Sequence, residues 1–171
     1  RYVVDAAGYR SPIADKYQLR QGAREMQART RSIFTHMTGV KLYEEVIAST
    51  QASGSPTPLA QSTLHHMFKG GWLWIIPFNN HPHSTNPLCS IGLQLDIDEH
   101  GPAGDPEVEF KQFLDDHPSV ARHFEGAARV REWTVAPRLN YTSRESVGDR
   151  YCLLGHAVGF VDPLFSRGLV N

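Results

Sequence analysis

Apolar and polar positions alternate in the middle of the chain, as expected for half-buried strands. Residues 63–69 and 72–78 form the clearest pair, and Gly70-Gly71 between them supplies a tight turn, so we predict a β-hairpin. Residues 89–95 repeat the alternation, with an apolar side chain at every second position. Because these segments follow one another closely, we expect them to pair antiparallel in one sheet.

Helical signals follow these strands. Asp105-Pro106 combines an N-cap residue with a proline at the first helical position, which predicts a helix through about residue 114. Residues 119–125 predict a second short helix, and residues 13–17 a third near the start of the chain. We therefore expect a pair of helices to interrupt a mainly antiparallel sheet.

The rest of the chain is predicted as extended segments and connections. Residues 18–31 are polar and rich in arginine, which favours an exposed connection or a mobile loop. Residues 32–46 favour a strand, followed by a turn of helix. The loops are expected at 49–62 and 79–87, a turn at 146–149, and extended segments at 130–135, 138–143 and 150–154.

Two strands near the ends of the chain run into small residues. Tyr2 to Val4 lead into Asp5-Ala6-Ala7-Gly8, and the last strand leads into Gly155-His156-Ala157. Small residues let a ligand approach the backbone, and a helix N-terminus, which Asp162-Pro163 prepares, offers N–H groups to an anionic ligand. This arrangement suits a nucleotide cofactor, although strand-glycine-helix turns occur throughout α/β proteins. Because the chain begins with Arg1 in a strand already under way, we expect it to be part of a longer protein.

Composition and charge exclude several classes of function. The 171 residues carry 17 Lys and Arg against 18 Asp and Glu, a net charge of -1, so no basic surface for nucleic acid is indicated. No apolar run approaches the ~20 residues of a membrane span, and no signal peptide opens the chain. We expect a soluble, cytoplasmic protein with no nucleic-acid or membrane partner.

Metal and hydrolase sites are not supported. His65 and His66 are neighbours on a predicted strand and point to opposite faces, while His81 and His83 lie in a loop without a nearby Cys or carboxylate. Ser166 lacks the frame of a hydrolase nucleophile. The two cysteines, far apart and outside any CxxC pattern, are expected to be free thiols.

Three segments together resemble one family. Residues 4–11 (VDAAGYRS) look like the Asp-Gly type segment of flavoprotein monooxygenases of the para-hydroxybenzoate hydroxylase fold. Residues 72–77 (WLWIIP) match W-x-W-x-I-P, the motif of flavin-dependent halogenases, and residues 153–166 (LLGHAVGFVDPLFS) are similar to the family's FAD-contacting G-D-A-x-G-F-x-D-P-x-F-S segment. The resemblance implies an α/β (α+β) chain that is part of an FAD-binding para-hydroxybenzoate hydroxylase-like fold, mainly a mixed or antiparallel sheet with a few helices.

The resemblance also implies site residues. Residues near FAD would be Asp5, Gly8, Gly155, His156, Ala157, Asp162 and Pro163. The backbone N–H groups of Arg167 and Gly168 would hold a halide. Trp72 and Trp74 would form an active-site wall, with packing in the core as the alternative, because alternate positions on a strand share a face. His156 stands where the family has an Asp that accepts hydrogen bonds from the flavin side chain, which removes a charge-assisted bond.

The implied organisation is one incomplete domain with three parts. Residues 1–17 would form a flavin-site strand and turn, residues 18–145 a substrate-side antiparallel sheet with a helical insertion, and residues 146–171 a flavin-contacting strand and turn leading to a helix N-terminus. The family's G-x-G-x-x-G motif and catalytic Lys lie upstream of the first segment, and no lysine here occupies a matching position. We therefore expect this chain alone to be inactive.

The implied function is that of an FAD-dependent halogenase-like oxidoreductase, which uses flavin hydroperoxide chemistry on an electron-rich, small-molecule substrate. A separate flavin reductase would supply reduced FAD. The alternatives are a related FAD-dependent monooxygenase or reductase without halide chemistry, and a cofactor-free binding or scaffold fragment.

Overall fold

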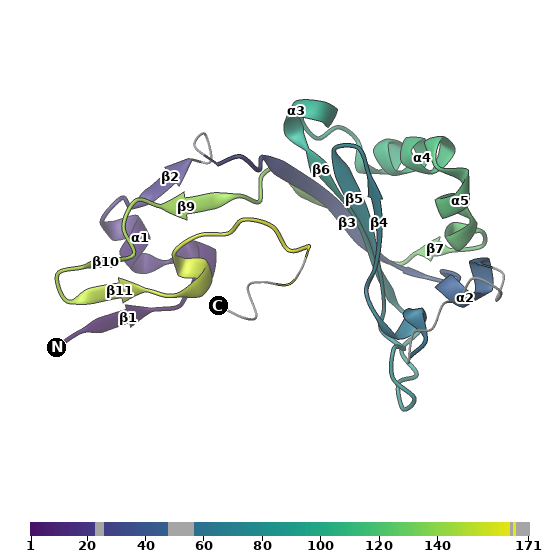
Figure 1. Cartoon of the computed structure of the whole chain (residues 1–171), viewed down its shortest axis with the longest axis horizontal. Coiled ribbons are helices and arrows are strands. Elements are labelled where there is room, and N and C mark those ends of the chain that lie inside the picture. Colours follow the sequence, from purple (N-terminus) through teal and green to yellow (C-terminus); the bar gives the residue numbers. More distant parts are fainter. Residues whose placement is uncertain (23–25, 48–56, 165, 167–171) are drawn as a thin grey trace. The chain divides into compact units, whose positions relative to one another are not determined.

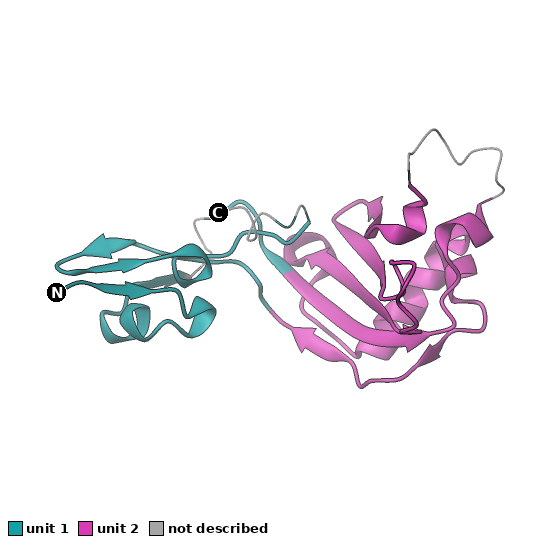
Figure 2. Cartoon of the chain, turned by 90° about the horizontal axis from the view of Figure 1, so that it is seen from below, with its two compact units in different colours: residues 1–30, 138–171 teal, residues 31–137 magenta. Residues whose placement is uncertain are grey.

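The computed structural model describes residues 1–22, 26–47, 57–164 and 166. The chain divides into two compact units, shown in different colours in Figure 2. Unit 1 combines residues 1–30 with residues 138–171, and unit 2 consists of residues 31–137. Figure 1 shows that both contain strands and helices, which confirms the predicted mixed α/β class.

Unit 2 is built on a sheet in the order β4-β5-β6-β3-β7, with β8 also paired to β3. The pairs β4-β5, β5-β6, β3-β7 and β3-β8 are antiparallel. The strands are β3 (Thr30–Thr38), β4 (Leu64–Phe68), β5 (Gly71–Pro77), β6 (Cys89–Asp96), β7 (Ala128–Arg129) and β8 (Thr134–Ala136). β4 and β5 pair antiparallel around Gly70, whose φ of +75° places it in the left-handed region that glycine adopts readily. The predicted hairpin and the strand of residues 89–95 are therefore confirmed.

Helices cover one face of this sheet, as Figure 1 shows for α4 (Pro106–Asp116) and α5 (Pro118–Ala121). The predicted helix start is confirmed, because the Asp105 carboxylate accepts hydrogen bonds from the backbone N–H groups of Glu107 and Val108. Phe110 and Phe113 of α4 pack on the sheet. The buried residues of this core are Ile33, Met37, Leu73, Ile75, Cys89, Ile91, Leu93, Leu95, Phe110, Phe113 and Val120.

The shorter elements of unit 2 lie in its connections. They are α2 (Tyr43–Val46), η4 (Leu59–Gln61), α3 (Ile97–His100) and η5 (Arg122–Phe124). The predicted strand with a following helical turn over residues 32–46 is confirmed by β3 and α2. Part of the expected loop at 49–62 lies outside the described residues, and the rest includes η4.

Unit 1 contains two small sheets, with strand orders β1-β11-β10 and β2-β9. The strands are β1 (Val3–Asp5), β2 (Arg20–Gly22), β9 (Tyr141–Ser143), β10 (Val147–Gly148) and β11 (Tyr151–Leu153), and the helices are η1 (Gly8–Arg10), α1 (Pro12–Lys16) and η6 (Gly155–Ala157). β1 and β11 pair in parallel, with Val4 opposite Cys152. Ala14, Leu19, Tyr151, Leu153 and Ala157 form its core.

Three details of the predicted elements are wrong. Residues 18–31 are not an exposed connection, because Leu19 is buried and residues 20–22 form β2 against β9. The predicted turn at 146–149 lies instead at residues 149–150, since Val147 and Gly148 pair with β11. In the extended segment expected at 130–135, only its last two residues belong to a strand, β8.

Candidate functional site

The two turns expected to contact a cofactor lie side by side in unit 1. Parallel pairing aligns Asp5 of β1 with Leu153 of β11, and the backbone N–H of Leu154 donates to the carbonyl of Asp5 at 2.8 Å. Each strand then enters a short 3-10 helix, η1 or η6, and these two helices are in contact. Segments almost 150 residues apart in the sequence therefore end at the same edge of the small sheet.

The carboxylate of Asp5 shapes the first turn. It is buried and accepts hydrogen bonds from the hydroxyl of Ser11 at 2.7 Å and from the backbone N–H groups of Ala7 and Ile13. The Ser11 hydrogen bond is the main reason that the pKa of Asp5 lies below its ordinary value. Asp5 therefore acts within the described chain as a positioning residue, which holds β1 against the start of α1.

Glycines at the two turns leave the backbone open. Gly8 has a φ of +74° and Gly155 a φ of +52°, a region that other L-residues adopt at a cost. A Cβ placed on either residue would meet no atom within 4 Å among the described residues. Both backbones can therefore be approached closely by a flat or anionic group, and this geometry fits the cofactor implied by the sequence motifs.

Arg20 joins the two turns. Its guanidinium donates to the carbonyls of Gly8 and Tyr9 at 3.1 and 2.7 Å, and to the carbonyl of Ala157 at 2.7 Å. It also donates to the hydroxyl of Ser143 at 3.0 Å. One planar, permanently charged group thus fixes η1, η6 and β9 together, which the fork of an arginine can do and a lysine cannot.

Aromatic rings enclose the Arg20 guanidinium. Its central carbon lies 4.8 Å from the ring centroid of Tyr141 and 5.8 Å from that of Tyr9, within the range of cation–π contacts. The Tyr141 hydroxyl donates to the carbonyl of His156 at 2.7 Å, and burial raises its pKa above the ordinary value. The backbone of η6 is therefore held from two sides.

The imidazole of His156 is exposed at this edge. Its ring lies 5.1 Å from that of Phe160, edge to face, and only its backbone carbonyl is engaged by Tyr141. Ala157 next to it is fully buried in the core of unit 1. The side chain of His156 can therefore interact with a ligand, whereas Ala157 contributes through its backbone.

The segment after η6 runs along β9. Phe160 and Tyr141 exchange backbone hydrogen bonds of 2.8 and 3.0 Å, and a Cβ on Gly159 would lie 2.8 Å from the Tyr141 carbonyl. Asp162 then turns the chain, since its carboxylate accepts from the backbone N–H of Leu164 at 2.8 Å, with Pro163 between them. The halide residues expected from the resemblance, Arg167 and Gly168, lie outside the described residues.

The two tryptophans lie in unit 2, on the sheet face opposite α4. Their ring centroids are 5.5 Å apart, which confirms that Trp72 and Trp74 share a face. Trp74 donates from Nε1 to the hydroxyl of Ser90 at 3.2 Å, and its ring lies over Gly92, where a Cβ would come within 2.2 Å of it. Trp72 is buried, and Trp74 is half-buried. The pair can form a rigid aromatic wall.

Two residues of this site lie outside the three motif segments. They are Arg20 and Tyr141, which make most of the side-chain hydrogen bonds between the turns. In the sequence, only the neighbouring apolar residue Leu19 hints that Arg20 lies in a partly buried segment. Because its partners are backbone carbonyls of distant segments, spacing alone does not disclose its role.

Other kinds of site receive no support from the described residues. In the described part of the chain, no three His, Cys, Asp or Glu side chains gather so that they could bind a metal ion. Likewise, none of the described helices is both long and apolar enough to cross a membrane. Cys89 and Cys152 are free, and burial raises the pKa of Cys89 to about 12.

Relatives match the chain along its whole length. It is 49% identical over 173 residues to tetracycline 7-halogenase of Kitasatospora aureofaciens and 48% identical to monodechloroaminopyrrolnitrin halogenase PrnC of Pseudomonas fluorescens. Both alignments include 100% of this chain but only 31% and 30% of the relatives. The chain thus spans about a third of the length of these proteins. No protein-family model matches it.

Solved structures agree with the sequence relatives. Halogenase PltM, crystallised with phloroglucinol and FAD, is 49% identical and superposes with a TM-score of 0.89 over 99% of this chain and 34% of its own. The flavin-dependent halogenase CmlS, at 25% identity, has a TM-score of 0.69 and is covered to 28%. These matches confirm the resemblance inferred from the three motifs and the fold class.

Proposed function

We propose that this chain, which is homologous to flavin-dependent halogenases over its whole length, is part of an enzyme that halogenates an electron-rich small molecule. The observation that carries the proposal is the pair of open glycine turns held together by Arg20. The chain is about half identical to two halogenases over its whole length, a span that includes both turns and the tryptophan strand.

The chain's contribution to cofactor binding is mainly backbone. Gly8 and Gly155 would accept the close approach of FAD, and His156 would accept a hydrogen bond through a ring nitrogen. When bound and reduced, FAD would supply the electrons with which oxygen and a halide are converted to a halogenating agent. Arg20 and Asp5 would act as positioning residues that keep both turns in place.

The tryptophan strand would form part of the substrate side. Trp74 is fixed by Ser90 and by its contact with Gly92, so its ring is held rigidly. A flat aromatic wall excludes water and favours another electron-rich ring by stacking. We assign Trp72 and Trp74 to this wall, and the substrate to the class of electron-rich aromatic compounds. A separate flavin reductase would deliver reduced FAD.

The test uses the complete protein of which this chain is part. It is incubated with FAD, a flavin reductase with its nicotinamide donor, chloride or bromide, and phloroglucinol as the probe substrate, and products are identified by mass spectrometry. A halogenated product that requires the halide, FAD and reductase supports the proposal. A hydroxylated product would assign the chain to a monooxygenase instead, and absence of FAD binding would favour a cofactor-free role.

A matched pair of variants links the activity to the turns. Gly155→Val places a branched side chain where φ is +52° and the space is open, so FAD binding should be lost. Gly126→Val changes another glycine of positive φ, at +86°, in unit 2, which contains neither turn. Equal FAD affinity in the two variants would refute the assignment of Gly155 to the cofactor site.

A further inference from the structure

A cavity lies on the helix-covered face of the unit 2 sheet. It encloses about 480 Å³ between the sheet and α4, a volume typical of small-molecule sites. β5 presents Leu73 and Ile75 to this face, and it presents Trp72 and Trp74 to the other. The cavity therefore belongs to a different surface from the tryptophan wall.

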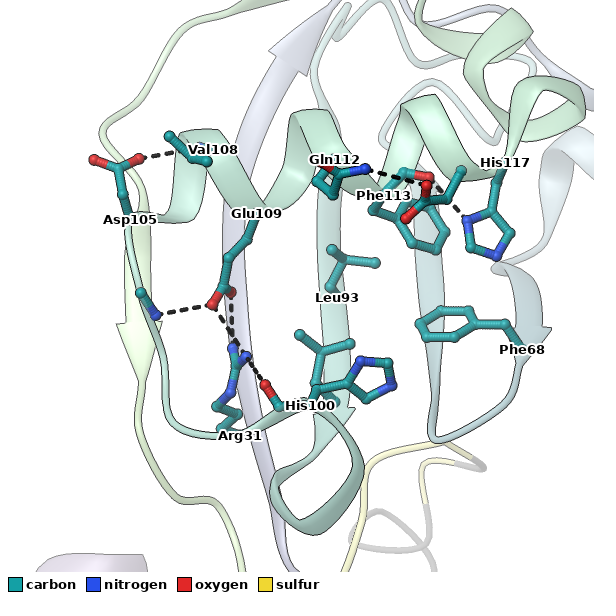
Figure 3. A pocket seen from close by; sticks show the side chains of 13 residues that line it. Arg31, Phe68, Leu93, His100, Asp105, Val108, Glu109, Gln112, Phe113 and His117 are labelled. Carbon is teal, nitrogen blue, oxygen red and sulfur yellow. Dashed lines mark hydrogen bonds and ion pairs between the residues drawn. The ribbon is translucent and has the colours of Figure 1, made fainter.

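One stripe of α4 lines the cavity along the whole helix. Its lining residues recur at the helical spacing of three and four: Asp105, Val108, Glu109, Gln112, Phe113 and Asp116. At 1.5 Å per residue this stripe is about 16 Å long, so the cavity is elongated. Figure 3 shows the stripe above the sheet, with Leu93 on the opposite side.

Apolar and aromatic side chains form one end of the cavity. Phe68 of β4 lies 4.9 Å from Phe113 and 5.5 Å from His117, measured between ring centroids, and His117 stacks on Phe113 at 4.3 Å. His117 is held by a 2.8 Å hydrogen bond between its Nδ1 and the Phe113 carbonyl. Figure 3 shows these rings grouped on one side of Leu93. This end can receive a flat, apolar group.

An internal ion pair closes the other end. Arg31 is almost fully buried, and its guanidinium bonds both carboxylate oxygens of Glu109 at 2.8 and 3.1 Å and the carbonyl of Gly101 at 2.8 Å. Glu109 also accepts from the backbone N–H of Gly104 at 2.8 Å. The charge of Glu109 is thus neutralised, and this end is rigid.

The remaining charge of the lining is negative. Asp105 caps α4, and Asp116 accepts a hydrogen bond from the Gln112 amide at 3.1 Å, but neither carboxylate has a cationic partner among the described residues. Asp116 also lies at the C-terminal end of α4, where the helix dipole favours positive charge. Phe113 beside it adds a ring face, which attracts cations.

We propose that this cavity binds a small organic cation with an aromatic body. The aromatic part would lie against Phe68, Phe113 and Leu93, and the ammonium group would face Asp116. This site lies beyond the proposed halogenase chemistry and does not depend on it. The volume of the cavity suits a ligand of this size, and the negative charge of its lining favours a cation.

The test measures binding to the complete protein by titration calorimetry, with tryptamine as the probe and indole-3-propionate as the matched anion of similar shape. Tryptamine should bind saturably, and the anion should bind at least about tenfold more weakly, because it faces carboxylates that have no cationic partner among the described residues. Equal affinity for the two probes, or no saturable binding of tryptamine, would overturn the proposal.

Two variants locate the binding. Asp116→Asn should weaken tryptamine about fivefold, whereas Asp115→Asn, the neighbouring exposed carboxylate outside the lining, should leave it unchanged. Val108→Trp, at an exposed position of the lining, should fill the cavity and abolish binding while the far-ultraviolet spectrum stays unchanged. Undiminished binding in Val108→Trp would show that tryptamine occupies another site, and would reject the proposal.

Discussion

Replacing Arg20 by lysine tests whether one guanidinium holds the two turns. Arg20 makes two short hydrogen bonds of 2.7 Å, to the carbonyls of Tyr9 and Ala157, which belong to different turns. A lysine ammonium keeps the charge, but it is a single point that cannot repeat the fork. The variant should therefore retain one of these bonds and lose the other.

The magnitude follows from the bond that is lost. Hydrogen bonds to charged groups contribute about 1.5–3 kcal/mol, so Arg20→Lys should lower the free energy of unfolding by about that amount. Because the turns separate more easily, the dissociation constant of FAD should rise about tenfold in the complete protein, equivalent to about 1.4 kcal/mol. Urea denaturation and a fluorescence titration with FAD measure the two effects.

Arg144→Lys is the matched control. Arg144 directly follows β9, is exposed, and its guanidinium donates one long hydrogen bond of 3.3 Å, to the carbonyl of Tyr17. Its replacement should change the free energy of unfolding by less than about 0.5 kcal/mol and leave FAD binding as it was. If Arg20→Lys behaved like Arg144→Lys in both assays, the role assigned to Arg20 would be wrong.

Three further variants test other parts of the structure. His156→Asp should tighten FAD binding several-fold, since a charged acceptor makes a hydrogen bond stronger by about 1 kcal/mol, and His156→Asn should not; a titration that ranks them equally would contradict a contact with the flavin. Burial lowers the pKa of His66 from 6.5 to about 4. Between these two pH values the unfolded chain binds a proton at His66 that the folded chain does not, so the free energy of unfolding should be highest above pH 6.5 and should fall as the pH drops toward 4. His66→Gln should flatten this profile in urea denaturation, and an unchanged slope would place its cause elsewhere. Gly92→Ala should cost about 1–3 kcal/mol and shift tryptophan fluorescence, because its Cβ would lie 2.2 Å from Trp74, while Gly104→Ala, where the nearest atom is at 3.4 Å, should be tolerated in a thermal melt.

The elements that could be predicted are those fixed by neighbouring residues. The hairpin follows from a glycine turn between two alternating runs, and α4 from Asp105 and Pro106 at its start. The three motifs likewise indicated the similarity to flavin-dependent halogenases, because each motif is contiguous in the sequence. In these cases the interactions that decide the structure span only a few residues.

The parts that could not be predicted depend on contacts distant in sequence. Nothing local aligns Asp5 with Leu153. The arginine-rich stretch of residues 18–31 suggested exposure because the partners of Arg20 and Arg31 lie far along the chain. The cavity beside α4 has the same origin, since its lining combines Arg31 and Phe68 with a helix far along the chain. Sequence patterns record which side chains are apolar, but not where space remains between them.

The discontinuity of unit 1 has a consequence for synthesis. Residues 31–137 are contiguous, so the sheet of unit 2 and its helices can form as soon as they leave the ribosome. β1 must wait for β11, which is made almost 150 residues later, and closing so long a loop is slow. Until then β1 lacks this partner strand, and an unpaired strand edge can pair with other chains. The nascent protein should depend on chaperones most in the interval between these two strands.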